Sequence, residues 1–309
     1  MAADDPSVPA SRSGAGPAPR ATVAAVVRGM RPTQWLKNGV VFAALVFGHE
    51  LTEPASVARV AWAAAVFCLL GSAMYLLNDV QDADRDRLHP AKRLRPVASG
   101  ALPPGVATGV AVILLAAGLL GALRLGPAFV AVGLAYVGLT LAYTHGLKRL
   151  VIVDVMAIAA GFVLRAVAGA VAIDVRISSW LLICTALLAL LLGFGKRRHE
   201  LATLPDAVGH RQNLQAYTLP LLDQLVTIVA AATLIAYAIY AVDAPPESGR
   251  HAMLATTPFV AFAVFRYLYL IHARGEGGSP EALLLRDRPL AAAIALWAAV
   301  CVLLLYTAI

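Results

Sequence analysis

Residues 61–86 read AWAAAVFCLLGSAMYLLNDVQDADRD, an apolar run that ends in a cluster of carboxylates. Residues 61–77 contain no charged side chain, and with residues 57–60 they reach the roughly 20 residues that a helix needs to cross a bilayer. The polar residues begin at Asn78 and Asp79, where the apolar run stops. This stretch predicts a transmembrane helix with reactive groups at one end.

The composition of the whole chain agrees with a membrane protein. Of its 309 residues, 60% are hydrophobic and 14% are charged, whereas a soluble domain has roughly a quarter of its residues charged. The net charge of +7 alone suggests a nucleic-acid partner. However, the basic residues lie between the apolar runs, which favours membrane topology and phosphate binding, so we expect no nucleic acid.

Nine apolar runs are long enough to cross the membrane. They cover residues 32–50, 57–79, 104–123, 126–144, 151–172, 178–195, 220–242, 252–271 and 289–307. The first is the weakest, because Gln34, Lys37 and Asn38 lie in its opening turns. An interfacial segment stays open for it. We therefore predict an all-α, polytopic helical bundle of about nine transmembrane helices.

The distribution of basic residues predicts the orientation. With the N-terminus inside, 19 of the 25 Lys and Arg residues lie in inner segments and 4 in outer loops. This bias predicts a cytoplasmic N-terminus in the plasma (inner) membrane. Residues 1–21 are rich in Pro, Ala and Ser and are expected to form a disordered cytoplasmic tail. Residues 22–309 are expected to form one transmembrane catalytic domain.

The acidic stretch after the second run has metal-ligand spacing. Asn78, Asp82 and Asp86 recur every four residues, so a continuing helix places them on one face with Asp79 beside them and Asp84 opposite. Clustered carboxylates repel one another, and a helix C-terminus disfavours negative charge. A cation relieves both costs, and oxygen ligands suit Mg²⁺. We predict Mg²⁺ bound by Asn78, Asp79, Asp82 and Asp86, the three aspartates being catalytic.

A basic segment follows within a dozen residues. Pro90 and Pro96 interrupt the helix, and Lys92, Arg93 and Arg95 lie between them. Cations close to metal-binding carboxylates suit a metal-bridged polyphosphate. Taken alone, the same residues are ordinary topology signals.

Two arginines lie inside predicted spans, where a charge costs at least a few kcal/mol. Arg165 follows Asp154 by eleven residues, so both are on one helical face. Phosphate binding and structural pairing within the bundle remain open for Arg165. Arg266 is about one turn from the inner boundary and is able to snorkel, so its role is open as well.

The order Asn-Asp-x-x-Asp-x-x-x-Asp after a span, in a chain with nine spans, resembles the first Asp-rich motif of the UbiA superfamily. The match runs from about residue 28 to the C-terminus. This resemblance implies an all-helical bundle that uses Mg²⁺ to hold a diphosphate.

Three further stretches resemble one branch, the decaprenyl-phosphate phosphoribosyltransferases. They are Arg31-Pro32-x-Gln34-Trp35-x-Lys37-Asn38, Gly195-Lys196-Arg197-x-x-Glu200 and Leu285-Arg286-Asp287-Arg288. In that branch a polyprenyl phosphate takes ribose 5-phosphate from phosphoribosyl pyrophosphate (PRPP). The resemblance implies both substrates as partners in the lipid bilayer. The expected substrate-binding residues are Lys37, Lys92, Arg95, Tyr143, Lys148, Arg165, Lys196, Arg197, Glu200 and Arg266.

The chain departs from the wider superfamily between the sixth and seventh spans. Most members have a second Asp-rich motif there, whereas this chain has Lys196, Arg197, Arg198, His199 and Glu200. Extra cations suit PRPP and a lipid phosphate, which carry more negative charge. Lys196 and Glu200 are also spaced as a surface ion pair.

Two other functions remain open. The first is transfer of a prenyl group from a prenyl diphosphate to an aromatic or quinone-precursor acceptor, which needs carboxylates for a second metal. The second is a lipid or ion transporter, although transporters favour ionisable groups near the midplane. The isoprenoid length, the number of metals, the pathway and the oligomeric state, including a homo-oligomer, are not determined by the sequence.

Overall fold

The structure is a computed structural model that describes residues 22–176, 178–203, 212–243 and 252–307. All regular elements in these ranges are helices. The prediction of an all-α bundle is confirmed. The expected disordered tail at 1–21 lies outside the described residues.

Eight helical segments are long and apolar enough to cross a membrane. They are α3 (Pro54–Gln81), α5 (Pro104–Leu123), α6 (Pro127–His145), α7 (Val153–Ile173), α8 (Ser179–Thr203), α10 (Leu219–Asp243), the pair η6 (Ala252–Thr256) and α11 (Thr257–Ala273), and α13 (Arg288–Thr307). Proline occupies the first turn of α3, α5 and α6, where its fixed φ is favourable and its missing N–H costs nothing. The chain is thus a multi-pass membrane protein.

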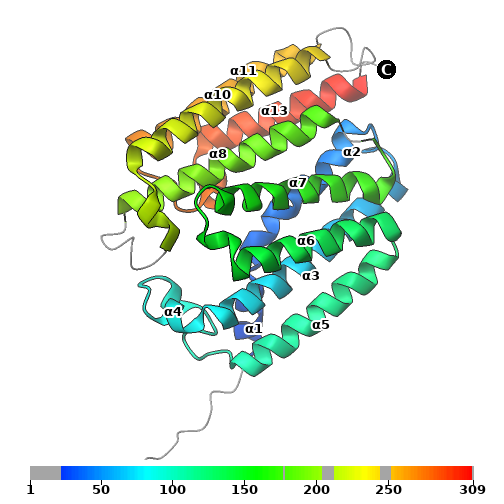
Figure 1. Cartoon of the computed structure of the whole chain (residues 1–309). Coiled ribbons are helices and arrows are strands. Elements are labelled where there is room, and N and C mark those ends of the chain that lie inside the picture. Colours follow the sequence, from blue (N-terminus) through cyan, green and yellow to red (C-terminus); the bar gives the residue numbers. More distant parts are fainter. Residues whose placement is uncertain (1–21, 177, 204–211, 244–251, 308–309) are drawn as a thin grey trace, which may run out of the picture.

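The helices run side by side, with α7 between two groups (Figure 1). One group contains α3, α5 and α6, and their buried side chains form one core with α7. The other contains α8, α10, α11 and α13, which form a second core around Val155 of α7. Because α7 touches both groups, side chains along it are placed to link the two halves.

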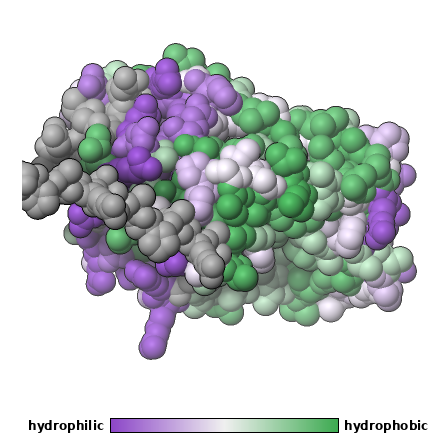
Figure 2. Space-filling view, turned by 90° about the horizontal axis from the view of Figure 1, so that it is seen from below, coloured by the Kyte–Doolittle hydropathy of each residue, from purple (hydrophilic) through white to green (hydrophobic). Residues whose placement is uncertain are grey.

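The connecting segments that contain short helices of their own gather at one end of the bundle, called here the site end. It carries α4 (Ala83–Arg87), η2 (Lys92–Leu94), η3 (Leu147–Arg149), η4 (Gln212–Ala216) and α12 (Pro280–Arg286). Figure 2 shows hydrophilic side chains concentrated there, next to a broad apolar surface. The opposite end, called the far end, has the shorter connections and the C-terminus (Figure 1).

The first predicted span, 32–50, is not one α-helix. The chain forms α1 (Val23–Met30), then an eleven-residue 3₁₀ helix, η1 (Pro32–Phe42), then α2 (Ala43–Phe47). A 3₁₀ helix rises about 2.0 Å per residue, so η1 and α2 together extend about 29 Å. It runs from Arg31, bonded to Asp79, to Leu45, bonded to Tyr306 near the far end. A ninth crossing is therefore made in a stretched form.

The ninth crossing packs closely on α7. A Cβ atom on Gly169 would lie 2.0 Å from the carbonyl oxygen of Val41. Only glycine allows the two backbones to approach this closely. This contact helps to hold η1 within the bundle, between α3 and α7.

Candidate active site at the site end of the bundle

The acidic stretch forms a nearly continuous helical path from α3 into α4. The Asp82 N–H donates to Asn78 O at 2.9 Å, and the Asp86 N–H donates to Asp82 O at 2.8 Å. Asp82 itself caps α3 with φ −93° and ψ 3°. As the spacing predicts, Asp84 points away: its side chain is 95% exposed and pairs with Arg87.

Two arginines neutralise Asp79 and Asp86. Asp79 is 1% exposed, and its Oδ1 accepts hydrogen bonds from Arg31 and, at 3.2 Å, from Arg95. Arg95 also donates to Asp86 Oδ2 at 2.6 Å. Burial lowers the pKa of Arg31, and the Asp79 carboxylate opposes that shift. Arg95 therefore joins the two buried carboxylates into one charged group.

The third carboxylate, Asp82, faces a different cation. Lys148 Nζ lies 2.9 Å from both Asp82 oxygens, and Asn78 Nδ2 donates to Asp82 Oδ2 at 3.1 Å. Lys148 is on η3, the short turn between α6 and α7. The segment between α6 and α7 thus closes over the acidic stretch.

In this structure the predicted ligands are paired with cations, and their assignment to a metal stays a prediction. Within the described ranges, no three His, Cys, Asp or Glu side chains lie close enough together to hold a metal ion. The reason is electrostatic: Arg31, Arg95 and Lys148 each draw a carboxylate toward themselves.

The donor atoms nevertheless fit a hard divalent cation. Every candidate ligand is an oxygen, the type that Mg²⁺ prefers. Asp79 Oδ2 is buried and accepts no hydrogen bond from the residues that the structure describes. A buried acceptor without a partner needs an explanation, and an ion is one.

A second charged cluster lies where α7 begins and α8 ends. Arg197 is fully buried, and it donates to Asp154 Oδ2 at 2.8 Å and to Glu200 at 2.7 Å. Tyr217 donates to Asp154 Oδ1 at 3.1 Å. Burial raises the pKa of Tyr217 to about 12. Arg197 was predicted to bind phosphate, but in this structure its contacts are with protein carboxylates.

The two arginines inside spans have different partners. Arg165 is 7% exposed and donates to Asn38 at 2.8 Å, to Tyr136 at 2.9 Å and to the Gly161 carbonyl at 2.9 Å. It has no ion pair with Asp154, which binds Arg197 instead. Among the two readings left open, these contacts favour bundle pairing.

Arg266 lies nearer the site end and pairs with a residue of the connecting loop. It donates to both oxygens of Asp287, at 3.1 and 2.8 Å. That pairing lowers the pKa of Asp287, with the hydrogen bond as the largest cause. The Arg286–Arg288 motif is thereby tied to α11.

The remaining predicted substrate residues are partly buried on four different elements. Lys37 lies on η1, Lys92 on η2, Tyr143 near the end of α6 and Lys196 on α8. Tyr143 interacts electrostatically with Arg197. The structure thus brings Tyr143 to the second cluster and leaves the substrate roles of all four as predictions.

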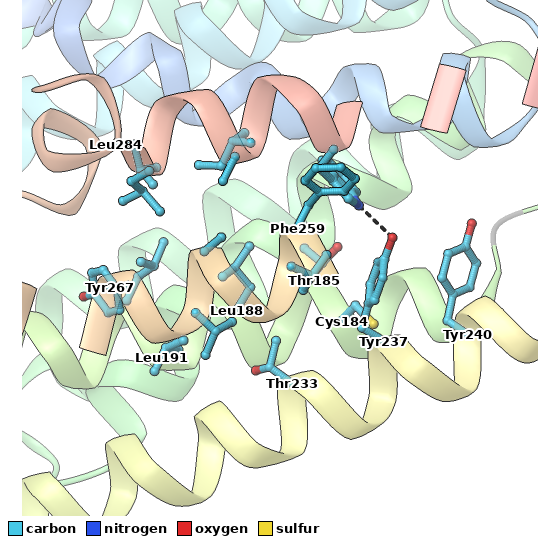
Figure 3. A pocket seen from close by; sticks show the side chains of 18 of the residues that line it. Cys184, Thr185, Leu188, Leu191, Thr233, Tyr237, Tyr240, Phe259, Tyr267 and Leu284 are labelled. Carbon is cyan, nitrogen blue, oxygen red and sulfur yellow. Dashed lines mark hydrogen bonds between the residues drawn. The ribbon is translucent and has the colours of Figure 1, made fainter. Parts of the chain in front are cut away.

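An apolar cavity of about 320 Å³ lies between α8, α10, α11 and α13 (Figure 3). Tyr267 and Leu284 line one end of it, and Tyr240 lines the other, where Phe47 packs against its ring. A Cβ atom on Gly195 would lie 2.3 Å from the Tyr267 hydroxyl. Since Gly195 precedes Lys196, the cavity wall adjoins the second charged cluster.

Three residues of these clusters were not assigned roles from the sequence. Arg31 was part of a quoted motif, and a basic residue at a span boundary is explained by topology alone. Asp154 gave a usable signal, because a carboxylate at the start of a span is costly unless paired. Tyr217 gave no signal, because its two bonds depend on the tertiary fold.

Comparison with known proteins places the chain in context. Residues 39–285 match the UbiA prenyltransferase family. The chain is 37% identical over 287 residues to the decaprenyl-phosphate phosphoribosyltransferase of Mycobacterium tuberculosis, covering 91% of this chain and 94% of the relative. It is 36% identical over 296 residues to the enzyme of that name from Corynebacterium glutamicum, covering 91% and 86%.

Solved structures share the fold. A UbiA homologue from Archaeoglobus fulgidus, bound to GPP and Mg²⁺, superposes with a TM-score of 0.72 at 21% identity. The superposition covers 91% of this chain and 99% of the homologue.

Proposed function

The chain belongs to the UbiA prenyltransferase family, and within it we propose that the chain transfers 5-phosphoribose from PRPP to a polyprenyl phosphate. A phosphate oxygen of the lipid forms a bond to C1 of the ribose, and the bond from C1 to the pyrophosphate oxygen breaks. Pyrophosphate leaves with that electron pair. The proposal makes the chain a phosphoribosyltransferase of cell-envelope glycolipid synthesis.

The position of Arg197 is the observation that carries this proposal beyond the family. Glu200 lies in the segment where a second acidic motif would be, and Arg197 of the same segment bonds to both Glu200 and Asp154. The buried guanidinium occupies these two carboxylates, whereas the first cluster keeps a buried carboxylate oxygen, Asp79 Oδ2, that accepts no hydrogen bond from the described residues. The cluster favours substrates with several phosphates over a prenyl diphosphate with an uncharged aromatic acceptor.

The chemistry asks for positioning and charge neutralisation. The acceptor phosphate is already an anion at neutral pH, so no general base is needed. Arg95, Lys148 and Lys196 would bind the donor phosphates and stabilise the charge that develops on pyrophosphate. Lys37 and Lys92 would contribute further contacts.

Asp79, Asp82 and Asp86, assisted by Asn78, would hold Mg²⁺. When bound, that ion would neutralise charge on the pyrophosphate. The unpartnered Oδ2 of Asp79 supports this assignment.

The apolar cavity suits the isoprenoid chain of the acceptor. Its lining is almost entirely hydrocarbon and aromatic, and its Tyr267 end adjoins Gly195 and Lys196. A volume of about 320 Å³ is that of a small-ligand pocket. The cavity would therefore hold the part of the chain next to the phosphate, and the remainder would lie in the bilayer.

We place the protein in the plasma membrane with the site end toward the cytoplasm. The support is the basic charge of the segments 80–103, 196–219 and 272–288, all of which connect at that end. Soluble PRPP would reach the site from the cytoplasm, and the lipid acceptor from the bilayer.

A direct assay tests the proposal. Purified protein in detergent is incubated with Mg²⁺, PRPP labelled in the ribose and decaprenyl phosphate, and the lipid is extracted. We expect label in the lipid and release of pyrophosphate in equal amounts. Transfer of a prenyl group from a prenyl diphosphate to an aromatic acid, with no labelled lipid from PRPP, would overturn it. Movement of the lipid without chemistry would favour a transporter.

A further inference from the structure

Ile152, between η3 and α7, has an unusual backbone conformation. Its φ is 68° and its ψ is −48°. The Val153 N–H donates to the Val151 carbonyl at 2.7 Å, which closes a three-residue γ-turn around Ile152. The γ-turn with positive φ is rare and strained, and a β-branched residue is especially disfavoured there. Such a turn persists only where surrounding contacts impose it.

Tyr217 makes a direct contact with the turn. The Ile152 N–H donates to the Tyr217 hydroxyl at 2.6 Å, across 65 positions of sequence. The same hydroxyl donates to Asp154 Oδ1, and Asp154 Oδ2 accepts from Arg197. Tyr217, Asp154 and Arg197 are all buried. A chain of hydrogen bonds from α8 thus ends on the strained turn.

The turn connects η3 to the start of α7, and further backbone hydrogen bonds fix the direction of this connection. The Asp154 N–H donates to the Leu150 carbonyl at 3.0 Å, and the Leu150 N–H donates to the Leu147 carbonyl at 3.1 Å. Little freedom remains between Ile152 and Lys148. Lys148, whose side chain is 12% exposed, contacts both oxygens of Asp82. A change at Ile152 is therefore expected to move Lys148.

We propose that Tyr217 is a positioning residue that holds Ile152 in the strained turn and thereby keeps Lys148 against Asp82. Its target is the part of the site that would bind the phosphates of the donor, and this last point rests on the proposed function. The cluster of Asp154, Arg197 and Tyr217 then fixes the position of Lys148 in the acidic site through the backbone of residues 147–152. The alternative is that Tyr217 only stabilises the bundle.

The first test measures the exposure of Lys148 without any reaction. Full-length wild type and Tyr217→Phe are treated with a limiting amine-acylating reagent, and labelling of each lysine is followed by mass spectrometry. Loss of one buried hydrogen bond shifts an equilibrium by roughly 2- to 10-fold, so labelling of Lys148 should accelerate by about that factor. Labelling of Lys92, which lies on η2, serves as the internal reference and should not change.

A rescue variant separates positioning from general stability. Glycine adopts positive φ without strain, and the Ile152 side chain is 40% exposed, so Ile152→Gly removes little packing. In Tyr217→Phe/Ile152→Gly the turn should form without the hydrogen bond from the Tyr217 hydroxyl, and protection of Lys148 from labelling should return. The melting temperature should remain at the level of Tyr217→Phe, because the buried Asp154 still lacks a bond.

Tyr306→Phe is the matched control. The Tyr306 hydroxyl also accepts from a backbone N–H, that of Leu51, and donates to an oxygen, that of Leu45, but near the far end. Its loss should lower the melting temperature without changing Lys148 labelling. In the transferase assay, Tyr217→Phe should raise the KM for PRPP by roughly 2- to 10-fold and leave the KM for the lipid phosphate within twofold.

Several results would overturn the proposal. Lys148 labelling in Tyr217→Phe equal to wild type would do so, as would failure of Ile152→Gly to restore protection. If Tyr217→Phe does not fold, Ile152→Pro replaces it. Proline forbids positive φ but is tolerated before a helix. Lys148 labelling in Ile152→Pro equal to wild type would again reject the positioning role of Tyr217. The labelling experiments stand even if the protein does not use PRPP, so the two proposals fail separately.

Discussion

The Arg165 guanidinium donates to the side-chain oxygen of Asn38 at 2.8 Å, across 127 positions of sequence. This bond joins α7 to η1 inside the bundle. Tyr136 adds a second acceptor from α6, and its ring lies 4.8 Å from the Arg165 carbon Cζ. A buried cation thus holds three crossings together through neutral partners.

Arg165→Met should destabilise the protein. Removing the guanidinium leaves Asn38 and Tyr136 with unsatisfied buried groups, at about 1–3 kcal/mol each. Thermal unfolding in detergent measures the effect, with Arg124→Met, an exposed arginine near the far end, as control. Loss of turnover at an unchanged melting temperature would indicate instead that Arg165 binds a substrate.

Asp82→Asn and Asp86→Asn should each reduce turnover at least a hundredfold, because a bound metal contributes several kcal/mol of charge stabilisation. Asp84→Asn, whose side chain points into solvent, is the matched control and should retain activity. Mg²⁺ titrations of all three variants provide the measurement. Equal and mild losses of turnover in all three variants would mean that the acidic stretch is not a metal site.

Lys196→Ala should raise the KM for PRPP by roughly 10- to 100-fold, since a charge-assisted contact with phosphate contributes about 1.5–3 kcal/mol. Arg274→Ala removes an exposed cation at the same end and should change KM little. Steady-state kinetics with PRPP varied at fixed lipid phosphate decide the matter. Unchanged PRPP kinetics would contradict the phosphoribosyl assignment.

Orientation is tested with single cysteines in a background lacking Cys68, Cys184 and Cys301. Cysteine at Ala91, exposed between α4 and η2, should resist an impermeant thiol reagent in intact cells and react in inverted vesicles. Cysteine at Leu123, exposed at the last residue of α5, should behave in the opposite way. Labelling of the Ala91 position in intact cells would reverse the topology.

Acidification should weaken the bond between α11 and the segment before α13. The pKa of Asp287 is lowered by Arg266, so its stabilisation is present above the usual carboxyl pKa of about 4 and is lost as pH falls through the lower, folded value. Asp287→Asn should therefore lose less stability than wild type between about pH 4 and pH 2. Melting temperatures over that range measure it, with the exposed Asp84→Asn as control.

The sequence predicted what depends on local pattern. Runs of apolar residues define the long helices, and the four-residue spacing from Asn78 to Asp86 predicted that Asp84 points away. The pairing of charges depends on which crossings are neighbours, and spacing along one helix carries no such information. Asp154 shares a helical face with Arg165, yet it bonds to Arg197, because α8 brings a guanidinium closer to it.

The stretched ninth crossing has a consequence for the order of biosynthesis. Residues 32–47 precede their partners in the chain: Ser72 and Cys68 of α3 follow soon after, whereas Arg165, Gly169 and Tyr306 follow much later. Leu51 and Leu45 cannot bond to Tyr306 until α13 has been made. The segment can therefore meet α3 early, but its contacts with α7 and α13 form only after those helices have been made, and the bundle closes in that order.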